Sequence, residues 1–193
     1  MKLILASSSP RRKELLNLVG IEPEILVPQV DESSRPGESI ETFLRRVTIA
    51  KGRAVYRDAF FDSPVISADT IVLCEDKIIG KPQSRADAFG FLKTLSDNMH
   101  EVLTGVSIFY RGVSHYDFAC TRVFFSAISD DEINYYLDNE NYMDKAGAYA
   151  IQGLASVFVK KIAGCYFNVM GFPLNLFYNM LKGMGISLYK DNQ

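Results

Sequence analysis

The sequence has 193 residues, of which 48% are hydrophobic and 23% charged, so it is long enough for one globular domain with a sizeable core. Its net charge of −2 argues against a general nucleic-acid-binding protein, because such domains carry a basic excess. Its three cysteines lack metal or disulfide spacing, and no apolar run is long enough for a signal peptide or a membrane span. We therefore expect a single domain over residues 1–193 in the reducing cytoplasm, with no nucleic-acid or membrane partner.

The chain opens with a short apolar run, a serine-rich turn and the start of a helix. Residues 3–5 predict a strand, and Ser9 is expected to cap a helix whose first residue is Pro10. The apolar residues of this helix are expected to be buried, namely Leu15, Leu16, Leu18 and Val19. Two cations follow Pro10, where each opposes the helix dipole by about 0.3–1 kcal/mol. Arg11 and Arg12 therefore either bind an anion at this helix end or are solvated surface arginines.

The first half of the chain alternates short strands with amphipathic helices. Apolar and alternating runs predict strands, and apolar residues at a 3.6-residue spacing predict helices. The expected strands span residues 24–30, 64–68, 71–74 and 78–79, and the expected helices span residues 39–56 and 84–96. Asp69 and Thr70 are expected to interrupt the strand that precedes them.

The second half is dominated by two long strands that a tight turn joins. Ser129 and Glu132 form a capping-box pattern at the start of a helix. The expected strands span 100–110, 114–127 and 154–162, the expected helices span 129–137 and a segment from Pro173, and the expected loops span 138–153 and 164–171. Alternating strands and helices followed by a strand pair favour an α/β fold with a mixed sheet.

Two carboxylates are candidates for chemistry. Asp69 lies in an otherwise apolar segment, where a carboxylate is costly to bury unless it is paired, bound to a metal or facing a cleft. The alternative is an aspartate that caps a turn at the end of a strand. Glu32 follows the strand expected at 24–30, and it is either a solvated loop acid or a second ligand of a cation shared with Asp69.

Two lysines and a glutamine are further candidates. Lys51 falls on the apolar side of its expected helix, so its ammonium group either reaches solvent or points into a cleft. Lys81 lies between a glycine and a proline, at a turn where it either contacts a phosphate or is solvated. Gln152 carries a donor and an acceptor, which suits the edge of a pyrimidine base; a plain loop amide is the alternative.

Together these candidates describe a site for phosphate chemistry. Two arginines and two lysines supply positive charge, and two carboxylates supply the oxygen ligands that Mg²⁺ prefers. In such a site the metal neutralises charge, and a carboxylate activates water for in-line attack on phosphorus. The sequence contains no dinucleotide-binding, P-loop, HExxH or CxxC motif.

Several segments resemble, in chain order, the Maf family of nucleoside triphosphate pyrophosphatases. They are residues 5–12 (LASSSPRR), 30–32 (VDE), 50–51 (AK), 67–70 (SADT), 80–82 (GKP), 104–106 (TGV), 144–149 (DKAGAY) and 168–173 (NVMGFP). The similarity covers residues 3–185. It implies a mixed, twisted sheet flanked by helices around a central substrate cleft, in a fold similar to that of Maf and ITPase-like proteins.

The resemblance also implies a metal-dependent hydrolase that cuts between the α and β phosphates and releases pyrophosphate. Asp69 would activate water and, with Glu32, hold Mg²⁺ or Mn²⁺. The residues implied to bind the triphosphate are Ser8, Arg11, Arg12, Lys51 and Lys81. Residues 148–153 resemble the branch that acts on dTTP and UTP, and the positions linked to specificity are Arg12, Thr70 and Gln152.

The family further implies a cytoplasmic protein linked to arrest of septum formation and to removal of unsuitable nucleotides; a homodimer is left open. Residues 97–98 and 139–143 depart from the family pattern, and the second departure adjoins the loop expected to face the base. One alternative is the same chemistry on other modified or non-canonical triphosphates. The other is a non-catalytic interaction protein of the division machinery, which would leave a carboxylate in an apolar strand unexplained.

Overall fold

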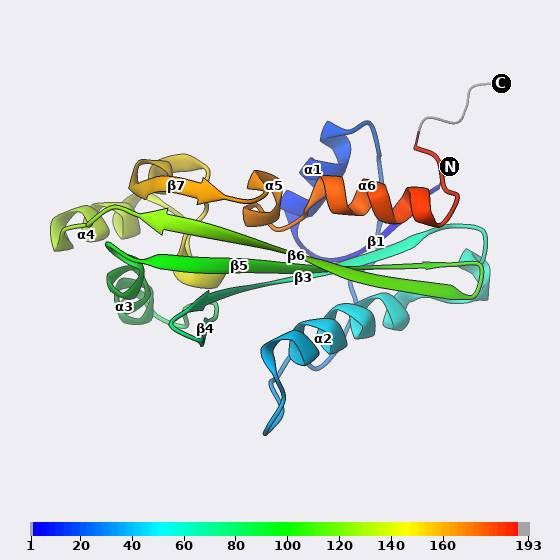
Figure 1. The fold of residues 1–193 in the computed structure, drawn as a ribbon, viewed down its shortest axis with the longest axis horizontal. Coiled ribbons are helices and arrows are strands. Elements are labelled where there is room, and N and C mark those ends of the chain that lie inside the picture. Colours follow the sequence, from blue (N-terminus) through cyan, green and yellow to red (C-terminus); the bar gives the residue numbers. More distant parts are fainter. Residues whose placement is uncertain (1, 189–193) are drawn as a thin grey trace. The chain divides into compact units, whose positions relative to one another are not determined.

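The computed structural model describes residues 2–188, which form a mixed seven-stranded sheet with helices (Figure 1). The strands are β1 (Ile4–Ala6), β2 (Glu24–Ile25), β3 (Val65–Cys74), β4 (Lys77–Ile79), β5 (Met99–Tyr110), β6 (Val113–Phe125) and β7 (Val159–Ala163). Their order is β2-β1-β3-β5-β6-β7, and β4 pairs with β3 off this path. β1 runs parallel to β2 and β3, whereas β3–β4 and β6–β7 are antiparallel, which confirms the predicted mixed sheet.

Most helices begin where their capping residues predict. The helices are α1 (Pro10–Leu18), α2 (Ile40–Val55), α3 (Arg85–Leu95), α4 (Asp130–Asn139), α5 (Tyr166–Val169) and α6 (Leu174–Gly183), with 3₁₀ turns η1 (Asp58–Phe60), η2 (Ala146–Ala148) and η3 (Gly153–Phe158). The capping box of Ser129 and Glu132 is present, and Ser39 caps α2 by accepting from Thr42 N. Among residues 2–188, no helix is both long and apolar enough to cross a membrane.

The chain forms two compact units, each assembled from segments that are distant in sequence. The first unit contains the residues up to Asp69, Thr104–Ala119 and the residues from Gly171, and the second contains Thr70–Leu103 and Cys120–Met170. Strands β3, β5 and β6 each contribute residues to both units. The expectation of a single domain over residues 1–193 stays a prediction.

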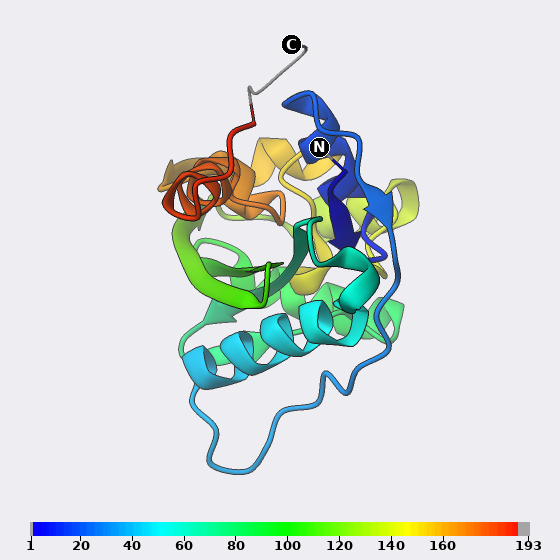
Figure 2. The ribbon, with the colours of Figure 1, turned by 90° about the vertical axis from the view of Figure 1, so that its right-hand side faces the viewer.

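In the first unit, helices α1 and α6 cover one face of the strands and α2 covers the other (Figure 1, Figure 2). A cluster of buried side chains lies within this unit, formed by Ile4, Ala6, Val55, Phe60, Val65 and Phe109. The close packing of α2 depends on Gly52, because a Cβ there would lie 2.5 Å from a ring carbon of Phe109. Any larger residue at position 52 would push α2 away from β5.

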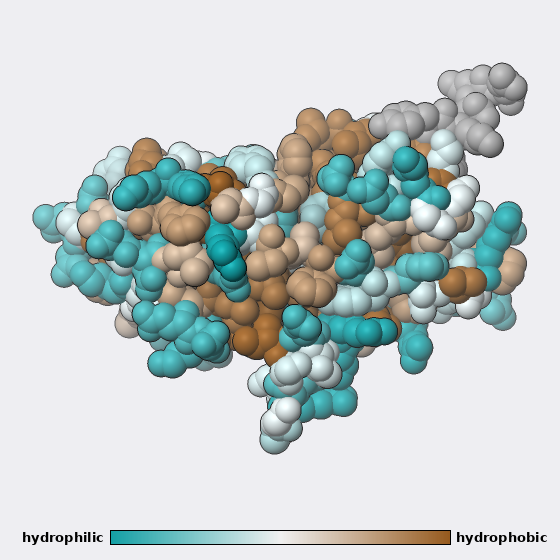
Figure 3. All heavy atoms as spheres, viewed as in Figure 1, coloured by the Kyte–Doolittle hydropathy of each residue, from teal (hydrophilic) through white to brown (hydrophobic). Residues whose placement is uncertain are grey.

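Helix α1 buries less apolar surface than its sequence predicts. Leu15 and Leu16 are buried as expected, but Leu18 and Val19 are exposed, and Figure 3 shows hydrophobic residues over this helix. The third buried residue of α1 is Arg12, whose hydrogen bonds therefore replace part of the expected apolar contact. The prediction of a four-residue buried stripe was wrong.

Three strand and loop boundaries also differ from the predictions. The strand expected at 24–30 is only two residues long, because β1 is short and Pro28 has no N–H to donate. Residues 154–158 form η3 instead of a strand, since pairing with β6 begins only at Val159. The loop expected at 164–171 contains the short helix α5.

The core of the second unit contains a histidine. His100 is fully buried, its Nε2 lies 2.7 Å from Tyr149 Oη, and its Nδ1 has no hydrogen-bond partner. The rings of Phe125 and Tyr149 contact it edge-on. Burial lowers the pKa of His100 from its ordinary value of 6.5 to about 4, because the apolar surroundings disfavour the imidazolium ion.

This burial predicts an acid-sensitive stability. The pKa of His100 is 6.5 in the unfolded chain and about 4 in the folded chain. Burial of the neutral ring therefore does not reduce the unfolding free energy above pH 6.5. As the pH falls from 6.5 toward 4, the unfolding free energy decreases, because the unfolded chain binds a proton that the folded chain does not. Between pH 7.5 and pH 5 the unfolding free energy should drop by about 2 kcal/mol more in the wild type than in His100→Gln. Urea unfolding at both pH values measures this drop. His115→Gln, at the exposed second histidine, should keep the wild-type slope; an unchanged slope in His100→Gln would contradict the prediction.

Candidate active site

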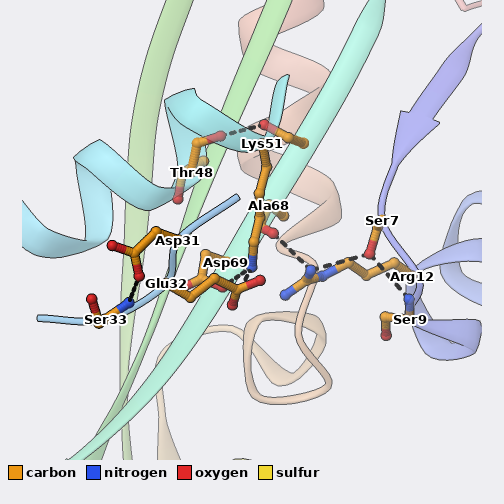
Figure 4. A network of polar contacts seen from close by, with 11 residues as sticks. Ser7, Ser9, Arg12, Asp31, Glu32, Ser33, Thr48, Lys51, Ala68 and Asp69 are labelled. Carbon is orange, nitrogen blue, oxygen red and sulfur yellow. Dashed lines mark hydrogen bonds and ion pairs between the residues drawn. The ribbon is translucent and has the colours of Figure 1, made fainter. Parts of the chain in front are cut away.

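A lysine lies between two carboxylates in the first unit (Figure 4). Lys51 Nζ donates to Asp69 Oδ1 at 2.6 Å and to Glu32 Oε2 at 2.8 Å. The side chains of Lys51 and Asp69 are 9% and 12% exposed, whereas that of Glu32 is 53% exposed. The cluster therefore has one buried ion pair and one partner that reaches solvent.

Asp69 is held inside a continuous strand. The prediction that Asp69 and Thr70 interrupt the strand was wrong, because β3 runs unbroken from Val65 to Cys74. Two residues earlier, Ser67 Oγ donates to the carbonyl oxygen of Thr48 on α2 at 2.6 Å and lies 2.7 Å from Ser107 Oγ. These contacts join β3 to the helix that carries Lys51. Asp69 lies in the middle of a strand and pairs with a buried lysine, so the alternative that it caps a turn at the end of a strand is contradicted.

The loop that carries Glu32 is attached to α2 by an arginine. Arg46 donates to the carbonyl oxygen of Ser33 at 2.8 Å and forms a two-pronged pair with the carboxylate of Glu38 at 2.7 and 2.8 Å. Asp31 accepts from Ser33 N, and hydrogen bonds from Ser33 lower the pKa of the Asp31 carboxyl group. Helix α2 thus fixes both Lys51 and the backbone beside Glu32. The sequence alone did not single out Arg46, because its carboxylate partner lies eight residues away, just before the start of α2.

Arg12 is a buried residue that connects three segments. Its Nε donates to the carbonyl oxygen of Gly171 at 2.9 Å. Its Nη1 donates to the carbonyl oxygen of Ala68 at 2.7 Å and to the hydroxyl oxygen of Ser7 at 3.2 Å. Burial lowers the pKa of Arg12, and the nearby charge of Asp69 opposes this shift. A solvated surface arginine is therefore contradicted, whereas a role in substrate binding stays a prediction. Its contact with Ala68 reaches the residue directly before Asp69.

The serine-rich turn leads into α1. Ser9 occupies the N-cap without a side-chain cap hydrogen bond, and its N–H donates instead to Ser7 Oγ at 3.1 Å. Ser8 is exposed and Arg11 is half-buried on the same turn. The helix begins without an acidic residue in its first turn, so an anion would be favoured there.

Glu32 and Asp69 suit a hard divalent cation. Their carboxylate oxygens converge on one cationic group within hydrogen-bond distance. Among residues 2–188, no cluster of three or more histidine, cysteine or acidic residues has the geometry of a metal site. Mg²⁺ commonly binds through one or two carboxylates together with substrate phosphates, so a pair of carboxylates is an adequate donor set.

The remaining predicted residues lie in the second unit. Thr70 follows Asp69 on β3 and is half-buried, and Lys81 and Gln152 are exposed. The segment before Gln152 is anchored inside this unit, since Tyr149 Oη contacts His100 and Gly147 N donates to the carbonyl oxygen of Gly80 at 3.1 Å. The last contact places the backbone of this segment beside the turn that carries Lys81. The roles of these residues stay predictions.

Comparison with known proteins assigns the family. The model of the Maf-like protein family matches residues 2–184, so the chain belongs to the Maf family. A dTTP/UTP pyrophosphatase from Syntrophomonas wolfei is 43% identical over 189 residues, covering 97% of this chain and 100% of that protein. A dTTP/UTP pyrophosphatase from Clostridium novyi is 41% identical over 191 residues, covering 97% of this chain and 100% of that protein. The solved structure of the Staphylococcus aureus Ham1 protein aligns with a TM-score of 0.49 and 12% identity, over 95% of this chain and 100% of that one.

The Arg12 contacts predict a loss of stability on substitution. Arg12→Met keeps much of the apolar stem but leaves two buried carbonyl oxygens, those of Ala68 and Gly171, without this donor. The unfolding free energy should fall by about 2–4 kcal/mol, as for lost hydrogen bonds from a buried charged group. Urea unfolding measures it, and Lys13→Met, at an exposed position of the same helix, should stay within about 0.5 kcal/mol of the wild type. Equal stability of the two variants would contradict this role.

Proposed function

We propose that this chain is a nucleoside triphosphate pyrophosphatase that hydrolyses dTTP and UTP to the monophosphate and pyrophosphate, with a divalent cation. The observation that carries the proposal is the buried pair of Asp69 and Lys51, with Glu32 as the second carboxylate. The Maf relatives at 41–43% identity over nearly the whole chain bear the name dTTP/UTP pyrophosphatase, which supports the substrate class.

Asp69 is the proposed general base. Its carboxylate takes a proton from the attacking water, whose oxygen forms a bond to the α-phosphorus while the bond to the bridging oxygen breaks. The electron pair of that bond leaves with pyrophosphate. Glu32 and Asp69 would hold Mg²⁺ or Mn²⁺, which supplies charge neutralisation at the phosphates. The fixed position of Asp69 in mid-strand favours in-line attack, because the base does not need to be ordered during the reaction.

Positive charge for the triphosphate comes from several residues. Lys51, Arg11 and Lys81 are proposed to bind phosphate oxygens, with Ser8 at the N-terminal turn of α1. Arg12 is proposed to contribute mainly through its hold on the backbone of Ala68 and Gly171. This hold on the residue before Asp69 is proposed to position the general base, in addition to the predicted role of Arg12 in substrate binding and specificity.

Gln152 is proposed to read the base. Thymine and uracil present an N–H between two carbonyl oxygens, and a glutamine amide can accept from the first and donate to one of the others. Gln152 lies between buried Ile151 and Gly153, whose φ of +77° sets the turn that follows it. Arg12 and Thr70 are the further proposed specificity positions. The cytoplasmic location, the link to septum formation and a homodimer stay predictions.

Removal of the proposed base tests the chemistry. Asp69→Asn keeps the shape of the side chain but removes the proton acceptor, so kcat should fall by at least about a thousandfold while the chain still folds. The measurement is pyrophosphate release from dTTP, UTP and purine triphosphates with Mg²⁺ or Mn²⁺. Asp62→Asn removes an exposed aspartate that pairs with Arg111, and it should keep wild-type turnover. Wild-type turnover in Asp69→Asn would reject the assignment.

Truncation of Gln152 tests base recognition separately. Gln152→Ala should lower kcat/KM for dTTP and UTP about 10- to 100-fold, because the imide edge of the base loses its partner. The kcat/KM for purine triphosphates should change little, so the preference for dTTP and UTP over purine triphosphates should become smaller. Gln29→Ala alters an exposed glutamine of the first unit and serves as the control. An equal loss on all triphosphates would show that Gln152 does not select the base.

A further inference from the structure

We propose that Lys51 holds, in the nucleotide-free protein, the place between Glu32 and Asp69 that a divalent cation takes, so that the metal binds strongly only together with the nucleotide. This inference rests on the proposed function, because it uses the carboxylates as metal ligands and Lys51 as a phosphate ligand. It concerns the order and coupling of binding, which the proposed reaction leaves open.

The first argument is geometric. The ammonium group of Lys51 lies within 2.8 Å of an oxygen of each carboxylate, and its side chain is 9% exposed. A magnesium ion binds carboxylate oxygens at about 2.0–2.1 Å. An ion bound to these two oxygens would therefore lie within about 5 Å of the ammonium group, where a monovalent and a divalent cation repel strongly in a partly buried site. Simultaneous binding of the metal and of Lys51 to the carboxylates of Glu32 and Asp69 is therefore unfavourable.

The second argument is the balance of charge. Glu32 and Asp69 supply two negative charges, and Lys51, Arg12 and Arg11 supply three positive charges, since Arg12 interacts electrostatically with both carboxylates and with Arg11. The free site therefore carries no net negative charge, and a dication alone would add two uncompensated positive charges. A metal–triphosphate complex is negatively charged, so it brings its own compensation. Charge thus favours entry of the complex over entry of the bare ion.

The third argument is that Lys51 is the cation able to move. Arg12 is bound to two backbone carbonyl oxygens and to Ser7, whereas Lys51 donates to the two carboxylates themselves. Its four-carbon stem is flexible, and its ammonium group donates equally well to phosphate oxygens. When the nucleotide binds, its phosphate oxygens can therefore replace Glu32 and Asp69 as the partners of Lys51, and the two carboxylates become available to the metal. By linkage, nucleotide and metal must each raise the affinity of the protein for the other.

The experiment measures Mn²⁺ binding by calorimetry and by the electron paramagnetic resonance signal of free Mn²⁺. Wild-type protein should bind Mn²⁺ at least tenfold more tightly with an uncleavable dTTP analogue that has a methylene group between the α and β phosphorus atoms. Lys51→Met without any nucleotide should bind Mn²⁺ at least tenfold more tightly than the wild type without nucleotide. Lys93→Met removes an exposed lysine that pairs with Asp130 in the second unit, and it should match the wild type.

Equal Mn²⁺ affinity of Lys51→Met and the wild type, including no binding by either, would overturn the inference. Lys51→Gln is measured in parallel, because it keeps a hydrogen bond to one carboxylate and is expected to show the same gain if Lys51→Met does not fold. Failure of the proposed function is a separate result: no pyrophosphate release from any triphosphate by the wild type. Normal release with unchanged Mn²⁺ affinity in both variants would reject only the inference.

Discussion

The buried ion pair of Lys51 and Asp69 is the constraint around which the first unit is organised. A charge removed from water is costly, and loss of either partner leaves the other uncompensated, at a cost of about 3–5 kcal/mol. The pair therefore requires α2 and β3 to stay in close contact. The hydrogen bond from Ser67 to the carbonyl oxygen of Thr48 holds these two elements together, and Gly52 lets α2 pack closely against the neighbouring strand β5.

Two arginines support this pair by binding the backbone next to its carboxylates. Arg12 binds the backbone on the N-terminal side of Asp69, and Arg46 binds the backbone on the C-terminal side of Glu32. Both use the guanidinium group to join chain segments, which a lysine could not do with the same geometry. The result is a carboxylate pair whose positions are set before any ligand arrives, as electrostatic catalysis requires.

The second unit contains the exposed amide of Gln152, and buried contacts anchor the segment before it. Gln152 reaches solvent, yet the segment before it is bound to the core through Tyr149 and His100. His100 is fully buried at this contact, and its low pKa keeps the ring neutral at physiological pH. A neutral, buried contact of this kind anchors the segment that leads to Gln152, the residue proposed to recognise the base.

Patterns within a few positions of the sequence predicted the capping box at Ser129, the helix of Lys51 and the motif around Asp69, because neighbouring residues set these features. They did not predict that β3 continues through Asp69, because the partner that makes a buried carboxylate tolerable lies 18 residues away and is brought close only by folding. Likewise, the sequence could not show whether Arg12 is buried or solvated at the surface, since one of its acceptors, Gly171, is 159 residues away in the chain. Contacts at such separations depend on how the whole chain folds, and no local pattern encodes them.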